Sequence, residues 1–326
     1  MIIPKTIPSG SKHFSFQQLD EGIFAAIAEE DGAAVSNSGV IDLGGQIVVF
    51  DTFLTPQAAL DLRRLAEETC GRTPQIVVNS HYHNDHIWGN QVFAPDAQII
   101  ASEGTRQLML TAGKEELQWY TANSAQKLAS LQSQYQQAGD ADSRRKLEMW
   151  IGYYAGLVEA LPDLRVCMPG ITFTGRLAIH GSHRTAKLAT FEGGHTGSDT
   201  VLHLPEDGIV FMSDLLFVGC HPYLADGDPD RLLDALKELR RLDAACFVPG
   251  HGPVGTARDL ELLAEYIETC METARMLVKE GNAAKERIAG LKVADAYAQW
   301  QFPQFFQANI QFLCQRLKAA GGEKHE

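Results

Sequence analysis

The chain has 326 residues, a formal net charge of −13 at pH 7, 45% hydrophobic residues and 21% charged residues. This composition is that of a globular protein with a full hydrophobic core, and the negative charge argues against a nucleic-acid partner, because phosphate binding requires clustered lysine and arginine. No apolar run approaches the roughly 18 residues of a membrane span, and the N-terminus lacks a signal-peptide core, so we expect a cytoplasmic protein with no membrane partner.

The first part of the chain predicts antiparallel strands, then a helix and a buried strand. Short apolar runs separated by turn residues lie near residues 14–16, 23–27, 40–41 and 47–50. A helix is expected to begin at Thr55, with Thr55 as its N-cap and Pro56 in its first turn, and to end near Glu68. The apolar run 74–78 predicts the buried strand that follows.

Residues 114–160 have a different character and predict a helical hairpin. Two segments rich in helix-forming residues are separated by Ala138-Gly139-Asp140, which favours a break between two helices. The hairpin carries more aromatic residues than a purely solvated pair of helices needs. Packing against the body of the protein, a lid over a site, and a dimer interface are three interpretations of this surplus.

The rest of the chain predicts more strands, one of them before the hairpin, and then helices. Strands are expected near residues 98–101, 172–173, 177–179, 188–191, 200–203, 209–212 and 245–248. Helices are expected at 228–242, 257–280, 284–297 and 303–319.

Three imidazoles and one carboxylate lie within six residues, from His81 to His86, directly after a predicted buried strand. Imidazole and carboxylate are ligands that zinc and similar metals prefer. In an extended segment His81, His83 and Asp85 would share one side and His86 would face away. We therefore expect a tight turn from residue 84 that places these groups around two metal centres. The alternative, an exposed polar loop, leaves the clustering of three of the chain's 11 histidines unexplained.

Three more candidate ligands lie near the ends of later predicted strands. His195 lies in a glycine-rich loop, Asp214 follows the run 209–212, and His251 lies in a Pro-Gly-His-Gly segment. Each would be an ordinary surface residue if taken singly, but strand ends meet at one rim of a sheet, and the ordered set is specific. Asp51 ends an earlier strand, and we interpret it as a hydrogen-bond acceptor that braces the His81–His86 loop; an ordinary turn aspartate is the alternative.

The order His-x-His-x-Asp-His, Gly-His, Ser-Asp and Pro-Gly-His-Gly resembles the metallo-β-lactamase superfamily over about residues 14–255. The resemblance implies an α/β protein, a four-layer αβ/βα sandwich of two mixed sheets flanked by helices. Residues 1–255 would form the catalytic domain with the hairpin 114–160 inserted, and residues 256–326 would form a C-terminal helical extension packed on the same domain.

The resemblance also implies two divalent metal ions, with zinc expected and iron or manganese as alternatives. The ligand residues are histidines and aspartates from the motifs above. One ion would be bound by His81, His83 and His195, the second by Asp85, His86 and His251, and Asp214 would bridge both.

Asp214 separates this chain from true zinc β-lactamases, which typically lack an aspartate at the bridging position. The chain is more similar to glyoxalase II, lactonases and related esterases, although the glutathione-binding basic residues of glyoxalase II have no match in its C-terminal helices. The expected reaction is hydrolysis of a small ester, thioester, lactone or related bond by a hydroxide shared between two metals. Asp85 would orient that hydroxide and transfer its proton. His221 and Tyr223 are either substrate contacts or ordinary loop residues.

Two other functions remain open at this point. One is an oxidoreductase similar to the persulfide dioxygenases, which use one iron, and the other is a phosphodiesterase, which the acidic charge disfavours. The partner is expected to be a small molecule, whose identity depends on residues 114–160 and 216–228. The hairpin is also a candidate surface for a homo-oligomer.

Overall fold

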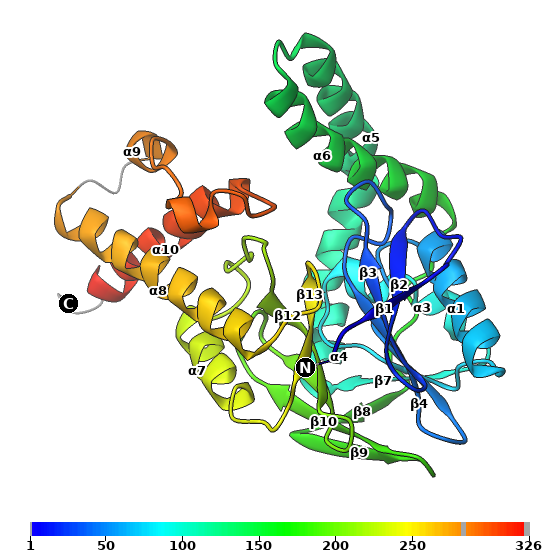
Figure 1. Cartoon of the computed structure of the whole chain (residues 1–326). Coiled ribbons are helices and arrows are strands. Elements are labelled where there is room, and N and C mark those ends of the chain that lie inside the picture. The colour runs from blue at the N-terminus through cyan, green and yellow to red at the C-terminus, as the bar shows by residue number, and fades with distance from the viewer. Residues whose placement is uncertain (1, 282–284, 323–326) are drawn as a thin grey trace.

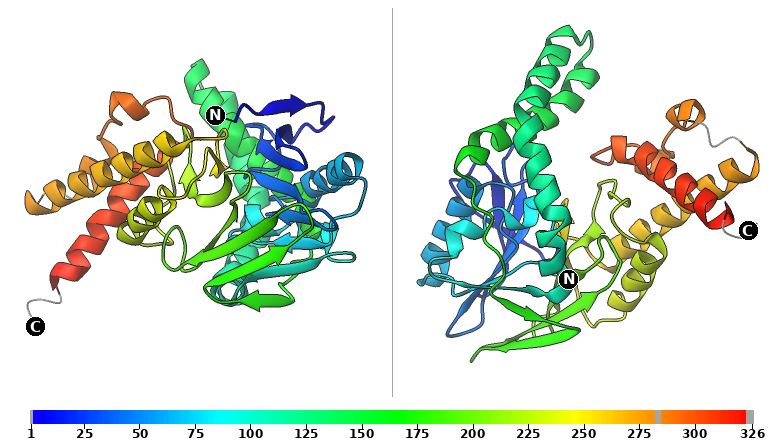
Figure 2. Two further views of the ribbon diagram at one scale, coloured as in Figure 1. Left: turned by 60° about the horizontal axis from the view of Figure 1, so that its bottom comes forward. Right: turned by 180° about the vertical axis from the view of Figure 1, so that it is seen from behind.

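The computed structural model describes residues 2–281 and 285–322 (Figure 1). Two β-sheets pack against each other, and helices cover the outer face of each sheet (Figure 1, Figure 2). This is the expected four-layer αβ/βα sandwich. Among the described residues, no helix combines the length and the apolar character that a membrane span requires.

The first sheet contains eight of the described strands, hydrogen-bonded in sequence order. They are β1 (Lys5–Ile7), β2 (Phe14–Asp20), β3 (Ile23–Ala28), β4 (Ser38–Asp42), β5 (Ile47–Phe50), β6 (Ile76–Val78), β7 (Gln98–Ser102) and β8 (Ile171–Phe173). Strands β1 to β5 are antiparallel, and β5 to β8 are parallel. The short β1 is not among the strands that the sequence predicts.

Helix α1 (Pro56–Cys70) connects β5 to β6 and begins where the sequence predicts. The Thr55 side chain accepts a hydrogen bond from the backbone N–H of Ala58, and Gly71 ends the helix at φ 69°. The shorter helices of this half are α2 (Asn84–Ile87), α3 (Asn90–Phe93) and α4 (Glu103–Leu110).

The second sheet has five described strands in the order β13-β12-β11-β10-β9. They are β9 (Arg176–His180), β10 (Thr185–Phe191), β11 (Asp199–Leu204), β12 (Ile209–Phe217) and β13 (Cys246–His251). β12 does not end at Met212, as the sequence predicts, but runs through Asp214 to Phe217. Ser213 adopts φ 47° and the pairing with β13 shifts register there, so a bulge redirects the strand without ending it.

The core between the sheets is apolar and closely packed. Ile41, Val48 and Phe50 of the first sheet face Leu202 and Phe211 of the second, all of them buried. Gly39 allows this approach, because a Cβ atom there would lie 2.4 Å from the Phe211 ring. This core therefore holds the two sheets in a defined position relative to each other, and with them the ends of β6, β12 and β13.

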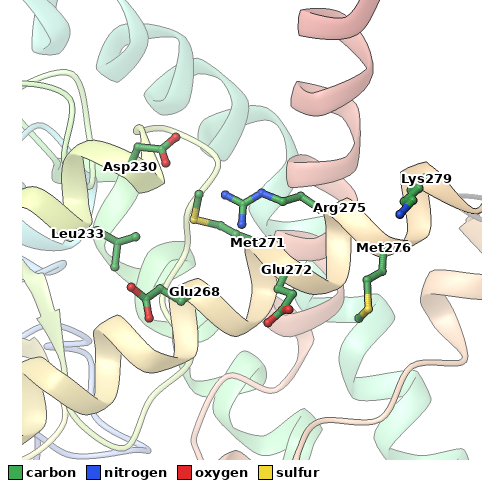
Figure 3. Close-up of a pocket in the computed structure, with 8 residues that line it drawn as sticks. All are labelled: Asp230, Leu233, Glu268, Met271, Glu272, Arg275, Met276 and Lys279. Carbon is green, nitrogen blue, oxygen red and sulfur yellow. The ribbon is translucent and has the colours of Figure 1, made fainter.

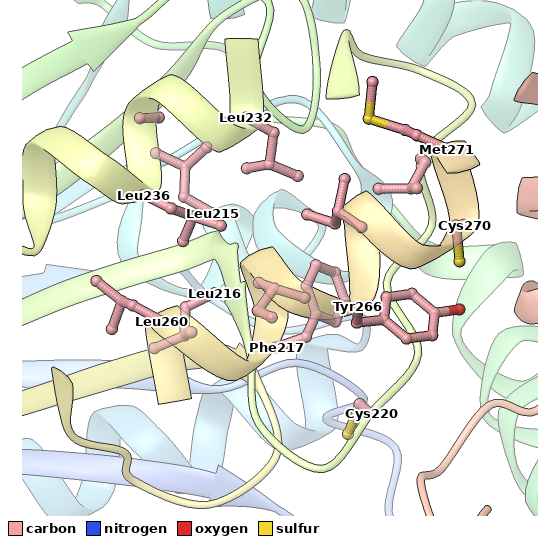
Figure 4. Close-up of a cluster of buried hydrophobic side chains, with 14 of the residues drawn as sticks. Leu215, Leu216, Phe217, Cys220, Leu232, Leu236, Leu260, Tyr266, Cys270 and Met271 are labelled. Atoms are coloured by element: carbon pink, nitrogen blue, oxygen red, sulfur yellow. The ribbon is translucent and has the colours of Figure 1, made fainter. Parts of the chain in front are cut away.

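Helices α7 (Pro229–Leu239) and α8 (Ala257–Lys279) cover the outer face of the second sheet (Figure 1). Figure 4 shows Leu232 and Leu236 of α7 and Leu260 of α8 gathered around Leu215 and Phe217 of β12. Helices α7 and α8 thus pack against the strand that carries Asp214.

The hairpin consists of α5 (Ala112–Gln137) and α6 (Ala141–Ala160), with the break at residues 138–140 as predicted. Its base packs on the body through Tyr82, Trp88 and Leu157, while its far end projects away (Figure 1, Figure 2). In Figure 1 the C-terminal helices α8, α9 and α10 lie on the other side of β13 from the hairpin.

The end of the chain differs in part from the expectation. Residue 284 lies outside the described residues, and the rest of the expected helix 284–297 consists of α9 (Lys285–Ala289) and a 3₁₀ turn, Asp295–Tyr297. Gly290 follows α9 directly, and glycine disfavours helix continuation. The last helix, α10 (Gln304–Gly322), lies where it was expected.

Candidate metal centre

The first four candidate ligands follow β6: His81 and His83 lie before α2, and Asp85 and His86 lie within it. β6 ends at Val78, and His83 is extended (φ −61°, ψ 146°) before the single helical turn of α2 begins at Asn84. This turn is the change of direction that the spacing of the four groups predicts. The turn points the side chains of Asp85 and His86 in other directions than those of His81 and His83, which precede it.

The other three candidate ligands come from the second sheet and its loops. His195 lies between β10 and β11, Asp214 lies in β12, and His251 is the last residue of β13. Asp199 closes the His195 loop, because its Oδ2 accepts hydrogen bonds from the backbone N–H groups of His195 (2.9 Å) and Thr196 (3.1 Å). Burial raises the pKa of Asp199 to about 7, although these hydrogen bonds oppose the shift.

The seven side chains form two groups, and within each group the donor atoms lie within 4.8 Å of one another. The first group is His81, His83, His195 and Asp214, and the second is Asp85, His86 and His251. Asp214 lies between the two groups: its Oδ2 is 3.2 Å from His195 Nε2, and its Oδ1 is 3.2 Å from His86 Nε2. The structure thus brings together every ligand that the sequence predicts.

Buried atoms without partners show that these residues fit metal ions. His81 Nε2, His86 Nε2 and Asp214 Oδ1 are buried and make no hydrogen bond. Buried polar atoms are rarely left unsatisfied, because their desolvation is costly. Imidazole nitrogens and carboxylate oxygens converging on two points would satisfy their bonding capacity by binding divalent cations.

The comparison with known families agrees with this geometry. The family model described as "Metallo-beta-lactamase superfamily" matches residues 31–251. This chain belongs to the metallo-beta-lactamase superfamily. Among curated proteins, nothing matches the chain.

Solved structures of superfamily members share the fold. A metallo-beta-lactamase from Pontibacter korlensis matches with a TM-score of 0.52 and 17% identity, covering 82% of this chain and 99% of its own. The metallo-beta-lactamase FIM-1 from Pseudomonas aeruginosa, in its mono-zinc form, matches with a TM-score of 0.56 and 17% identity, covering 80% of this chain and 97% of its own. At this identity the likeness concerns the fold alone.

Asp51 contacts His86 through Nδ1, the ring nitrogen that does not face Asp214. Its Oδ2 accepts hydrogen bonds from His86 Nδ1 (2.9 Å), Ser80 Oγ (2.7 Å) and Ser213 Oγ (2.9 Å), and its Oδ1 accepts one from the Ser80 backbone (2.8 Å). These bonds leave His86 Nε2 free to face Asp214. The position matches the bracing contact that the sequence suggested.

Sequence reasoning missed a second carboxylate in a similar position. Asp226 Oδ2 lies 2.9 Å from His83 Nε2 and accepts a hydrogen bond from the Tyr82 hydroxyl at 3.1 Å. His83 Nδ1 consequently faces His195 Nε2, at 3.1 Å. The available signal was weak, because Asp226 lies in the loop 216–228, where only substrate contacts were anticipated.

Glu116 is a second residue that the sequence did not single out. It lies in the first turns of α5, and α5 packs against α2. Burial, together with the charges of Asp85 and Asp226, raises the pKa of Glu116 to about 7, while His83 opposes the shift.

Burial and neighbouring charges shift the pKa values of the ligands in different directions. Burial lowers the pKa of His81 well below its ordinary value and that of His195 to about 3. Burial also disfavours charge on His86, but the carboxylates of Asp214 and Asp85 outweigh it and raise the His86 pKa well above its usual range. Burial likewise opposes the ionisation of Asp214, yet the surrounding histidines hold its pKa well below the ordinary value. An ionised Asp214 at the centre suits a shared position between two cations.

The two predicted substrate contacts occupy different places. His221 is buried, its Nδ1 lies 2.9 Å from the Tyr266 hydroxyl, and its ring packs against Trp300 and Phe306, so the structure does not bring it to the ligand groups. Tyr223 is half-buried against Phe305, and burial with the charges of Asp226 and Glu116 raises its pKa. The contact of Tyr223 with substrate stays a prediction.

A separate groove of about 510 Å³ runs along α7 and α8 (Figure 3). None of the candidate ligands lines it. Its lining residues are Asp230, Leu233, Glu268, Met271, Glu272, Arg275, Met276 and Lys279.

Proposed function

We propose that this protein is a hydrolase that binds two divalent metal ions and cleaves a small ester, thioester, lactone or related bond. The observation that carries the proposal is the pair of ligand groups with Asp214 between them. Two ions bound there would lower the pKa of a shared water and polarise the substrate carbonyl. Zinc is the proposed metal, because the donors are five imidazoles and two carboxylates.

Asp85 is the residue proposed to handle the proton. Its Oδ2 lies 3.5 Å from His251 Nε2 and 3.7 Å from His86 Nε2, while its side chain is 13% exposed, compared with 5% for Asp214. A carboxylate at this boundary can accept a hydrogen bond from the attacking water and pass its proton toward solvent. Asp214 is more enclosed and is proposed to hold the two ligand groups in register.

The test is a substrate panel on zinc-loaded protein that includes thioesters, lactones, β-lactams and phosphodiesters. We expect ester or thioester hydrolysis that disappears with a chelator and returns with zinc. His81→Gln should abolish this activity, whereas the same change at His180, an exposed histidine, should not affect it. Hydrolysis that persists after His81→Gln would disprove the proposal.

Metal analysis provides an independent check. Protein purified without added metal should contain two zinc or manganese ions per chain. One iron per chain together with oxygen consumption would replace the hydrolase proposal with the persulfide-dioxygenase-like one. Activity confined to phosphodiesters would instead assign the phosphodiesterase function.

A further inference from the structure

The loop between β3 and β4 belongs to the first sheet, yet it binds the end of β13 in the second sheet. The side-chain amide of the buried Asn37 donates hydrogen bonds to the carbonyl oxygens of Pro249 (2.9 Å) and Gly252 (2.8 Å). The Asn37 backbone N–H donates to the carbonyl oxygen of Gly250 at 2.7 Å. These three partners flank His251, so Asn37 holds the backbone on both sides of one candidate ligand.

The two residues before Asn37 contact the candidate ligands themselves. His251 Nδ1 donates to the Val35 carbonyl oxygen (3.1 Å), because a carbonyl group can only accept. The proton on Nδ1 leaves Nε2 of His251 to bind a metal ion, 3.5 Å from Asp85 Oδ2. The Ser36 hydroxyl donates to the backbone carbonyl oxygen of Asp85. Three consecutive loop residues thus fix the ring, the flanking backbone and a neighbouring ligand residue.

Val35 adopts a backbone conformation that residues of its type avoid. Its φ is 71°, in the left-handed region, where a β-branched residue is an outlier. Hydrogen bonds to the two preceding residues hold the loop in place. The Leu54 N–H donates to the Ala34 carbonyl oxygen (3.0 Å), and the Thr55 hydroxyl donates to that of Ala33 (2.9 Å). Strained residues persist where the surrounding structure determines them, and they are frequent at functional sites.

The contacts of this loop fall on one of the two ligand groups. His251 and Asp85 both belong to the second group. In the first group, Nδ1 of His81 lies 2.9 Å from Ser80 Oγ. His83 bonds through Nε2 to the loop after β12, as described above. Loss of the β3–β4 loop contacts would therefore loosen the second group and leave these hydrogen bonds of the first group in place.

We propose that Asn37 is a positioning residue for the second metal ion and acts through the backbone around His251. Val35 and Ser36 complete the contact, one at the imidazole ring and one at the Asp85 backbone. The inference rests on the two-metal site of the proposed function and does not depend on which bond that site cleaves. It assigns the two ions a different dependence on the β3–β4 loop, because only the second ion has ligands held by it.

The test is a cobalt(II) titration of metal-free Asn37→Asp. This change keeps the size of the side chain and an acceptor for the Ala28 N–H (2.9 Å) but removes the amide donor. We expect wild type to bind two ions and Asn37→Asp to bind one of them about 10- to 100-fold more weakly, the usual cost of losing a contact behind a metal ligand. The matched control is Asn123→Asp in α5, where the amide donates to the Trp119 carbonyl oxygen of the same helix. It should bind both ions normally.

Two reference variants identify the weakened ion, because the visible absorption of cobalt(II) depends on its ligands. His86→Gln removes a ligand of the second group, and His81→Gln removes one of the first. Asn37→Asp with one bound cobalt ion should have the spectrum of His86→Gln with one ion. A spectrum like that of His81→Gln, equal weakening of both ions, or a single bound ion in wild type would overturn the inference.

Thermal unfolding of the metal-free proteins shows whether Asn37→Asp is folded. If it is not, Ser36→Ala takes its place, because it removes only the hydroxyl that binds the Asp85 carbonyl oxygen and should weaken the same ion. Unchanged binding of both ions in folded Ser36→Ala would then refute the inference.

The same titration separates this inference from the proposed function. Two cobalt ions in wild type without hydrolysis of any substrate on the panel would disprove the hydrolase and leave the role of Asn37 open to the comparison of variants. Hydrolysis by wild type, together with unchanged affinity for both ions in Asn37→Asp, would disprove the positioning role alone.

Discussion

The Asp51 carboxylate joins the two sheets beneath the ligands. It accepts hydrogen bonds from His86 and Ser80 on one side and from Ser213 of β12 on the other. Asp51 itself adopts φ 63°, a left-handed conformation that asparagine tolerates better than most residues. Asp51→Asn is therefore a substitution that preserves size and backbone while replacing one of the two accepting oxygens with an NH2 donor, so the side chain can no longer accept from both the Ser80 backbone and His86.

We expect Asp51→Asn to weaken metal binding about 10- to 100-fold, the usual cost of losing a hydrogen-bond partner behind a metal-binding histidine. Competition with a chromophoric chelator measures this affinity. Asp234→Asn, at an exposed position of α7, makes the same chemical change and should bind metal normally. Equal affinities in the two variants would show that Asp51 does not orient His86.

The protonation of the buried His221 ring affects the stability of the folded protein. Burial lowers its pKa to about 4, compared with an ordinary value of 6.5, so the folded protein keeps the ring neutral. Between these two values the unfolded chain binds more protons at this position, and the free energy of unfolding must fall as the pH falls. At its steepest, the free energy of unfolding falls by about 1.4 kcal/mol per pH unit, the value for one additional proton bound by the unfolded chain.

The prediction is that His221→Gln removes this contribution. Denaturant unfolding at about pH 7.5, 6 and 5 should show the variant losing less stability than wild type as the pH falls toward 4. Metal release affects both proteins, so the difference between them at each pH is the relevant quantity. His180→Gln should follow wild type, and parallel pH profiles for wild type and His221→Gln would contradict the prediction.

The ligands were predictable from the sequence because each lies at a fixed position in a short motif. Asp226 and Glu116 were not, because their importance depends on tertiary contact. Asp226 is 143 residues from His83, and no local pattern connects the two. The same reasoning applies to His221, whose place after β12 suggested the site although its ring packs among C-terminal aromatic residues.

At the scale of elements, the hairpin is anchored by a short hydrogen-bond chain. Tyr153 of α6 donates to the Tyr120 hydroxyl of α5 (2.7 Å) and accepts from the side-chain amide of Asn84 at the start of α2 (3.2 Å). The hairpin is thus tied to the turn that carries Asp85 and His86. Among the proposed roles of the hairpin, its contribution to a homo-oligomer stays a prediction.

Tyr153→Phe should destabilise the protein by about 1–3 kcal/mol, because it leaves the Tyr120 hydroxyl and the Asn84 amide without partners. Tyr154→Phe removes the same atom from the next residue, whose hydroxyl has no hydrogen bond to another described residue. Chemical denaturation should therefore separate the two variants. A stability loss in Tyr154→Phe as large as that in Tyr153→Phe would show that the hydrogen-bond chain does not anchor the hairpin.

Element types were largely predictable, whereas their ends were less so. Thr55, Pro56 and Gly71 mark the limits of α1 in the sequence, because each has a local backbone role. β12 was predicted too short, because the polar pair Ser213-Asp214 interrupts the apolar run while the bulge keeps the strand paired to β13. A strand that continues through a bulge is determined by its neighbours in the sheet and not by its own periodicity.

At the scale of the whole molecule, each ligand group takes residues from both halves of the sandwich. His81 and His83 follow β6 of the first sheet, whereas His195 and Asp214 belong to the second. The other group likewise combines Asp85 and His86 with His251. Metal binding in this arrangement would join the two halves across the rim where they meet, and folding and metal affinity are thermodynamically linked.

This linkage predicts that metal stabilises the entire protein. A ligand at 100 times its dissociation constant adds about 2.7 kcal/mol to the free energy of unfolding, if it binds only the folded state. For a chain of this size we expect calorimetry to show a rise in Tm on the order of 5 °C when zinc is added to chelator-treated protein. The rise should be much smaller in Asp214→Asn, because Asp214 lies between the two ligand groups, and normal in Asp234→Asn. Because both sheets contribute ligands, the whole transition should shift as one. A transition that splits, with only one part moving with zinc, would show that the metal stabilises one half of the sandwich alone.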